Sequence, residues 1–226
     1  AFFKTARESM KFSRDGAQIN IKRASVVPAK GLCVSVPDGE MLSIAFSNKT
    51  SMLAVGPAEF KIEAFIQGSA ENSPDDNLDR ESAPSNISLS LKNGRFLFSL
   101  AQRLGSSKFT VKFPNAESEI QSGIAIAETG TNGSRLIPLD GFARIKPQDS
   151  IWEIVKDGIS AVVPAKESDK KIIFKHVYSR ERERFGNFIK TAEQLRRSVI
   201  FKYSPNAGFA AELILPKAFF AMPIKH

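Results

Sequence analysis

The chain has 226 residues, of which 42% are hydrophobic and 25% are charged, as in an ordinary globular protein. This composition excludes a fully disordered chain, a collagen-like fibre and a disulfide-stapled miniprotein. The net charge of +8 is uneven, because residues 1–140 carry a net charge of +1 and residues 141–226 one of +7. The length fits one large domain or two small ones.

The cysteine and phenylalanine counts indicate which interactions stabilise the fold. The one cysteine, Cys33, excludes a disulfide within the chain, so stability must come from the apolar core. There are 18 Phe against one Trp and two Tyr. Phe has no polar group, so we expect most of these rings to be buried. No apolar run approaches the roughly 18 residues of a transmembrane helix.

Alternation of apolar and polar residues dominates the first third of the chain. After residues 1–16, where 6–12 could form a short helix or a loose arm, period-two patterns predict strands at 18–23, 32–36, 41–46 and 60–65. The polar stretch 67–85 has almost no apolar residues and predicts a long exposed loop.

The alternation then continues more clearly. Strands are predicted at 87–92 and 96–100, joined by a hairpin turn at Asn93-Gly94, and again at 109–113, 120–127, 136–139 and 142–145. Many short strands at regular spacing are typical of all-β folds. The predicted fold class is therefore mainly β, as an antiparallel sandwich, roll or short solenoid with one C-terminal helix packed on the strands.

The C-terminal part mixes both patterns. A hairpin is predicted from 151–155 and 159–163 around Asp157-Gly158, with further strands at 171–177, 199–203 and 210–215. Residues 180–197 predict a helix whose apolar stripe packs on the sheet, formed by Phe185, Phe188, Ile189, Ala192 and Leu195. We expect a β domain at 1–146 and a basic α+β region at 147–226.

The sequence offers few candidates for a catalytic or zinc-binding site. The two histidines are His176 and His226, too few with one cysteine for a structural zinc site. A catalytic pair of Cys33 and His176 is formally open, but a cysteine in a Val-rich strand pattern is usually buried and inert. No phosphate-binding glycine loop and no GxSxG elbow occurs. We expect no enzymatic activity and no cofactor.

The polar stretch 67–85 contains one metal-like pattern. Asp75, Asn77, Asp79 and Glu81 alternate like the start of a calcium loop. Arg80 stands where that loop needs glycine, and Asn86 stands where it needs a bidentate glutamate. A solvated acidic loop is favoured over a calcium site, which the sequence leaves open.

The candidate binding residues are arginines. Arg180, Arg182, Arg184, Arg196 and Arg197 form the densest basic stretch and could attract an anionic partner. Glu181 and Glu183 alternate with the first three arginines, so a solvated helix with ion pairs is the competing interpretation.

Three segments carry a family resemblance: DGEMLSIAFSNKT at 38–50, MLAVGPAEFKI at 52–62 with its Gly-Pro turn, and 87–100 followed by 108–114, which holds Gly94-Arg95-Phe96 and FTVKFP. Through these segments, residues 16–146 resemble the FecR-type domain of bacterial envelope proteins. The family's Gly-Thr-x-Phe motif is replaced by Ser122-Gly123-Ile124-Ala125, and Lys30-Gly31 stands where the family has Gly-Asp.

The resemblance implies a non-catalytic β domain, periplasmic or secreted in a bacterium, with its signal peptide removed. It implies binding to a protein or an anionic envelope polymer, with a role in signalling. The family's cytosolic part and membrane helix are not seen in this sequence.

Two alternative functions stay open. A carbohydrate-binding or carbohydrate-processing β module would use exposed aromatic residues, for which Trp152, Tyr178 and Tyr203 are the candidates. Nucleic-acid binding would use the basic C-terminal part, but no signature of a nucleic-acid-binding family accompanies the charge. Nucleic acid is the less favoured partner.

Overall fold

A computed structural model describes residues 1–68, 79–165 and 171–201, and its named strands belong to one 16-stranded sheet. The strands are β1 (Phe2–Phe3), β2 (Lys11–Arg14), β3 (Ala17–Ile19), β4 (Ser25–Val26), β5 (Leu32–Val36), β6 (Met41–Phe46), β7 (Thr50–Gln67), β8 (Ser85–Leu100), β9 (Lys108–Lys112), β10 (Ala116–Ile120), β11 (Gly123–Gly130), β12 (Gly133–Asp140), β13 (Phe142–Pro147), β14 (Glu153–Lys156), β15 (Ile159–Pro164) and β16 (Ile173–His176). The helices are α1 (Ser179–Arg184) and α2 (Gly186–Ser198). The mainly β class with a C-terminal helix on the sheet is confirmed.

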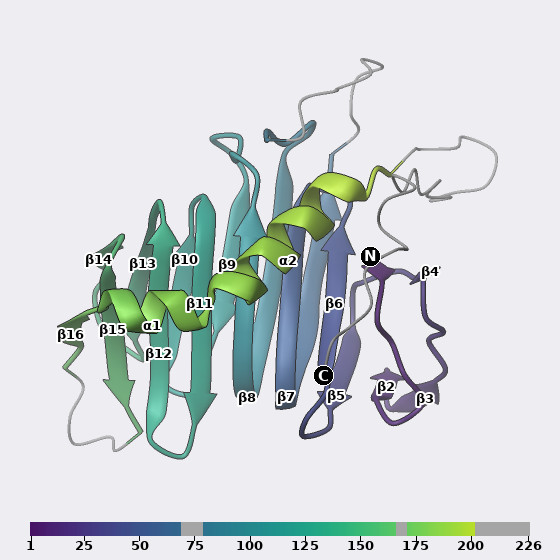
Figure 1. The fold of residues 1–226 in the computed structure, drawn as a ribbon, viewed down its shortest axis with the longest axis horizontal. Coiled ribbons are helices and arrows are strands. Elements are labelled where there is room, and N and C mark those ends of the chain that lie inside the picture. The colour runs from purple at the N-terminus through teal and green to yellow at the C-terminus, as the bar shows by residue number, and fades with distance from the viewer. Residues whose placement is uncertain (69–78, 166–170, 202–226) are drawn as a thin grey trace.

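The sheet folds into two layers because β7 and β8 each run through both. The first part of β7 pairs with β6 and its second part with β5, while β8 pairs first with β9 and then with β11. The helix-covered layer therefore contains β6, β11, β12, β15 and β16, and the second layer contains β2, β5, β9, β10, β13 and β14 (Figure 1). The pairings between named strands are antiparallel except that of β8 with β9, which is parallel.

Two glycines make the bend between the layers. Gly94 has φ +114°, and a Cβ there would lie 2.5 Å from the Cβ of Ala58. A Cβ on Gly56 would lie 1.7 Å from the backbone oxygen of Pro37. Glycine alone fits such contacts and such a φ. The predicted hairpin at Asn93-Gly94 is wrong, because β8 runs through this point as one bent strand.

The main core lies between the two layers. Phe60 in the second layer meets Phe96 in the helix-covered layer edge to face, with ring centroids 5.6 Å apart. Phe98 and Phe109 repeat this contact across the layers at 5.2 Å. These rings are fully or nearly fully buried. The expectation of buried Phe rings is confirmed at these positions.

A second apolar cluster lies on the outside of the helix-covered layer. Leu53 and Leu97 are paired neighbours on that face, and Ala192 and Leu195 of α2 pack with them in one buried cluster. Figure 1 shows α2 running obliquely across this layer. The predicted helix at 180–197 is confirmed in its place and its buried stripe, but it divides at Phe185, between α1 and α2.

Other local predictions fail where a distant strand decides the structure. The short helix considered over 6–12 is absent, and β2 instead pairs with β3 and β5. Asp157-Gly158 joins no hairpin, because β14 pairs with β13 whereas β15 pairs with β12 and β16. Strands from both sides of the expected boundary at 146/147 pair with one another, and the division into two regions stays a prediction.

Candidate functional site

The five predicted arginines do not form one surface. Arg196 is 6% exposed, donates to Ser99 Oγ at 3.2 Å and forms an ion pair with Asp79 at 2.8 Å. Arg197 reaches the same carboxylate at 3.1 Å. The hydrogen bond from Arg196 holds the pKa of Asp79 below its usual value. Both arginines thus attach α2 to the segment that precedes β8.

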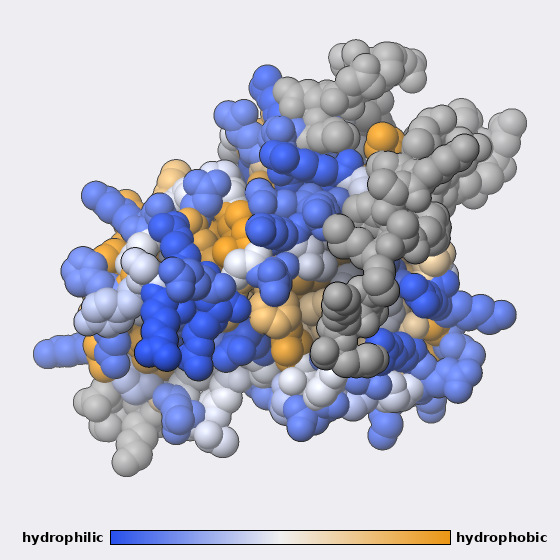
Figure 2. Space-filling model, viewed as in Figure 1, coloured by the Kyte–Doolittle hydropathy of each residue, from blue (hydrophilic) through white to orange (hydrophobic). Residues whose placement is uncertain are grey.

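The other three predicted arginines belong to α1. Arg182 forms an ion pair with Asp157 at 2.7 Å and donates to the backbone oxygen of Leu139. Arg180 and Arg184 are exposed, and neither has a carboxylate at ion-pair distance within residues 1–68, 79–165 and 171–201. Figure 2 shows the hydrophilic surface over α1. A role of these arginines in anion binding stays a prediction.

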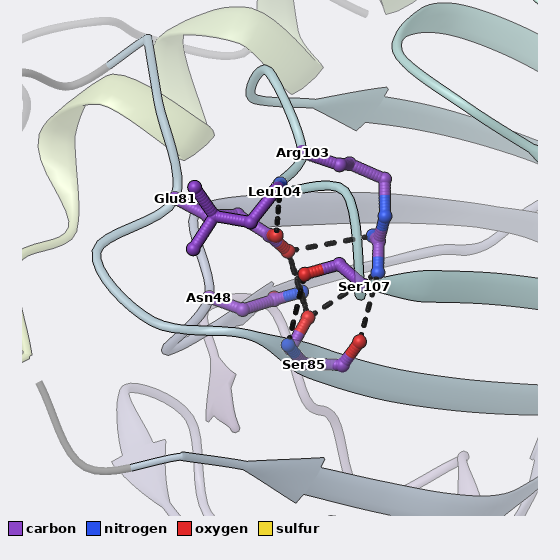
Figure 3. A network of polar contacts seen from close by, with 6 residues as sticks. All are labelled: Asn48, Glu81, Ser85, Arg103, Leu104 and Ser107. Carbon is purple, nitrogen blue, oxygen red and sulfur yellow. Dashed lines mark hydrogen bonds and ion pairs between the residues drawn. The ribbon is translucent and has the colours of Figure 1, made fainter.

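In the stretch 67–85, Gly68, Asp79, Arg80 and Pro84 are exposed as predicted, but the other described residues are not. Glu81, Ala83 and Ser85 are buried, and β7 and β8 include Gln67 and Ser85. The reason is a polar network around Glu81 (Figure 3). Glu81 accepts hydrogen bonds from Ser85 Oγ at 2.7 Å, Asn48 Nδ2 at 3.2 Å and the Leu104 amide at 3.1 Å.

Arg103 completes this network. Its guanidinium lies 3.6 Å from Glu81 Oε1, and the two side chains are 3% and 1% exposed. It also donates to the backbone oxygen of Ser85 at 3.3 Å. Burial lowers the pKa of Arg103, and the charge of Glu81 opposes that shift. Glu81 therefore holds the segment before β8 in place through buried polar contacts. The prediction that Glu81 lies in a solvated loop is wrong.

The calcium pattern gains no support from these contacts. Asp79 pairs with the two helix arginines and the buried Glu81 pairs with Arg103, so an arginine already engages each carboxylate. Asp75 and Asn77 lie outside the described residues. Within the part of the chain that the structure describes, no group of three His, Cys, Asp or Glu could hold a metal ion.

Cys33 and His176 do not meet. Cys33 is on β5, His176 is on β16, and β7, β8, β11, β12 and β15 lie between these strands in the sheet. A catalytic pair of these two residues is excluded by this separation. Among the described helices, none is long and apolar enough to cross a membrane.

One end of the molecule exposes large apolar side chains. This open end consists of Phe142, Ile151, Ile154, Ile173, Phe174 and Tyr178, which are six of the eight exposed large hydrophobic residues found in the described ranges. Ile151 and Tyr178 are 78% and 76% exposed. Hydrophobic surface shows beside β14 and β16 in Figure 2. Such a cluster is typical of an interaction surface.

Both strands at the open end are sheet edges. In the part of the chain that the structure describes, β14 pairs only with β13, and β16 pairs only with β15. All four residues of β16 are exposed, so this strand is covered on neither face. One side of each strand therefore presents unpaired backbone groups.

The aromatic residues considered for carbohydrate binding have separate surroundings. Trp152 is half-buried, with Arg144 Cζ 4.8 Å and Lys146 Nζ 4.7 Å from its ring centroid. These cations occupy the ring in a cation–π contact. Tyr178 belongs to the open end, and Tyr203 lies outside the described residues.

A groove on the outer face of the second layer was missed from the sequence. Its volume is about 490 Å³, and its lining comes from β2, β5, β7 and β8 together with Phe113 and Pro114. Five segments that are distant in sequence build it, so no local motif marks it. The one signal in the sequence is the alternation of apolar and polar residues along each strand, which indicates which side chains face outward.

The chain is similar in fold to solved structures of another protein. No protein-family model matches the chain, and no curated protein matches it. Two crystal structures of a putative anti-sigma factor from Parabacteroides distasonis ATCC 8503 are similar in structure. One, at 2.50 Å resolution, has a TM-score of 0.50 and 12% identity over 81% of this chain and 82% of that chain. The other, at 1.65 Å, has a TM-score of 0.48 and 13% identity over the same shares. The chain therefore shares the fold of the first of these structures at low sequence identity.

Proposed function

We propose that this chain is a non-catalytic FecR-like domain of the bacterial envelope, periplasmic or secreted, that binds a partner protein in signalling. The shared fold with the Parabacteroides distasonis anti-sigma factor structure supports this proposal. The motifs at 38–50 and 52–62 support it from the sequence, and in the structure they contain β6 and most of β7.

The open end is the observation that carries the proposal. Exposed apolar side chains beside an unpaired strand edge are the two features that strand addition by a partner uses, since backbone pairing gives affinity and side-chain pockets give specificity. We assign the occupant as an extended segment of the partner protein that pairs with β16. Its side chains on one face would contact Ile173, and those on the other face would contact Phe174.

The opposite end of the sheet supports this choice. There β1 pairs with β6 on one side and β4 on the other, so the edge of β6 is closed by Phe2 and Phe3, both buried. The last strand at that end, β3, has exposed Ala17 and Gln18 in place of large apolar residues. The chain thus covers the edge of β6 with its own strand β1, whereas no strand among the described residues covers the outer edges of β14 and β16.

Photo-crosslinking in the native cells tests the proposal. A photoreactive amino acid replaces Tyr178 or Ile151 at the open end, and Lys22, which is exposed near β3, in the control. The expected result is one cross-linked protein, the same from both open-end positions and absent from the Lys22 control. Cross-links of equal yield at Lys22, or none at the open end, would contradict a partner at this surface.

Cell fractionation of the full-length product tests the envelope location separately. Recovery in the envelope or the medium supports the export part of the proposal, and recovery in the cytoplasm overturns it. A hydrolase or transferase activity that is lost on substituting one carboxylate would overturn the non-catalytic part.

A further inference from the structure

The outer face of the second layer carries a row of side chains across four neighbouring strands. Ser13 on β2 pairs with Cys33 on β5, Cys33 with Lys61 on β7, and Lys61 with Ser90 on β8. Residues paired directly across a sheet project to the same face. All four line the groove of about 490 Å³.

The groove is positively charged. Its ionisable lysines and glutamate are Lys11, Lys61, Lys92 and Glu59, which give a net charge of +2. Lys92 neutralises Glu59 in an ion pair at 2.7 Å. Lys11 and Lys61 have no carboxylate at ion-pair distance in the described part of the chain, so two ammonium groups remain for a ligand.

The other polar side chains of the groove can donate hydrogen bonds. Ser13, Ser35 and Ser90 supply hydroxyl groups beside the free lysines, and the carboxylate of Glu59 is already engaged by Lys92. A neutral sugar is usually stacked on Trp or Tyr, neither of which lines this groove. A phosphodiester carries a negative charge and only acceptor oxygens, which complements lysines and hydroxyls.

We propose that this groove binds a phosphodiester chain, which lies across β2, β5, β7 and β8 with one phosphate at Lys61. The site is separate from the open end, because β5 and β16 are separated by five strands in the sheet. It also makes no use of the five arginines of α1 and α2. Recognition is by backbone charge, since no exposed aromatic residue lines the groove to stack on a base.

Fluorescence anisotropy with a labelled abasic deoxyribose-phosphate hexamer tests this site on the purified chain. The expected result is saturable binding that weakens at least tenfold in Lys61→Glu. The matched control, Lys156→Glu on β14, makes the same charge change at another exposed lysine and keeps binding within twofold. Ser13→Ala with Ser90→Ala provides a milder test that leaves the net charge unchanged, with a loss of at least threefold expected.

The single thiol reports occupancy directly. Cys33 is half-buried in the groove and is the one cysteine of the chain, so the hexamer should slow its alkylation by iodoacetamide at least fivefold. Unchanged alkylation at saturating hexamer would overturn the placement, and equal losses in Lys61→Glu and Lys156→Glu would show charge attraction without a site. Equal competition by hexaglutamate would overturn the choice of phosphate. No protein partner takes part, so failure here leaves the open-end proposal untouched.

Discussion

Glu81 and Arg103 form a buried ion pair, with 3.6 Å between Glu81 Oε1 and the guanidinium, that joins the segment before β8 to the loop after it. The pair is embedded in hydrogen bonds from Asn48, Ser85 and Leu104. Removing one partner of such a pair leaves a buried charge without compensation, which is far more costly than the pair is stabilising.

We therefore predict that Glu81→Gln lowers the free energy of unfolding by about 3–5 kcal/mol. Urea denaturation followed by circular dichroism measures this. Glu8→Gln, at an exposed position, is the matched control and should be nearly neutral. The double variant Glu81→Leu with Arg103→Met should recover much of the loss, because no lone charge is then buried. A loss below about 1 kcal/mol in Glu81→Gln would mean that the ion pair is not the anchor described here.

A buried leucine and a hydrogen bond attach α2 to the sheet. Leu195 is fully buried against the helix-covered layer, so Leu195→Ala should cost about 2–5 kcal/mol through lost burial and a cavity. Ser51 Oγ donates to the backbone oxygen of Ala192 at 2.7 Å, and Ser51→Ala should cost about 1 kcal/mol. Thermal unfolding measures both, with exposed Lys190→Ala as the control. Equal effects of Leu195→Ala and Lys190→Ala would contradict the packing of α2.

Gly94 gives a test of the bend in β8. Gly94→Ala places a Cβ against Ala58 at a φ that disfavours alanine, so we predict a loss of more than about 1 kcal/mol. Gly105→Ala is the control, because a Cβ at Gly105 meets no atom within 4 Å. Chemical denaturation measures the stability of both variants. If Gly94→Ala were as stable as Gly105→Ala, the bend in β8 would not require glycine.

Acid should release the contact between α1 and the sheet. Arg135 donates to Glu181 at 2.5 Å, and this hydrogen bond lowers the pKa of the Glu181 carboxyl. A carboxyl whose folded pKa is depressed stabilises the fold above its unfolded pKa, near 4.3, and loses that contribution as the pH falls through the folded value. The melting temperature of Glu181→Gln should therefore be lower than that of the unchanged chain at pH 7, and the difference should shrink by pH 3. A difference that persists at pH 3 would contradict this linkage.

Local alternation predicted several strands well. The expected strands at 32–36 and 41–46 are β5 and β6, because alternation over five or six residues suffices when one face is buried. The apolar stripe of the helix was predicted correctly for the same reason, since Phe185, Ala192 and Leu195 are buried at helical spacing. These features depend on near neighbours in the sequence.

The failures depend on distant residues. Asn93-Gly94 has the composition of a hairpin turn, yet Ala58 packs against Gly94 and keeps β8 continuous. Arg196 is one of several arginines in the sequence, and its burial follows from Asp79 and Ser99, which lie more than 90 residues away. The open end and the groove both arise from the order of strands in the sheet, which alternation alone does not give.

Hydrogen exchange of the β16 amides tests whether a partner adds a strand to this edge. The chain is measured alone and with the partner identified by cross-linking at Tyr178 and Ile151. Strand addition predicts that those amides of Ile173–His176 that point away from β15 exchange quickly in the free chain and slowly in the complex, because new backbone hydrogen bonds protect them. A complex that forms while these amides exchange at the unbound rate would contradict binding through this edge.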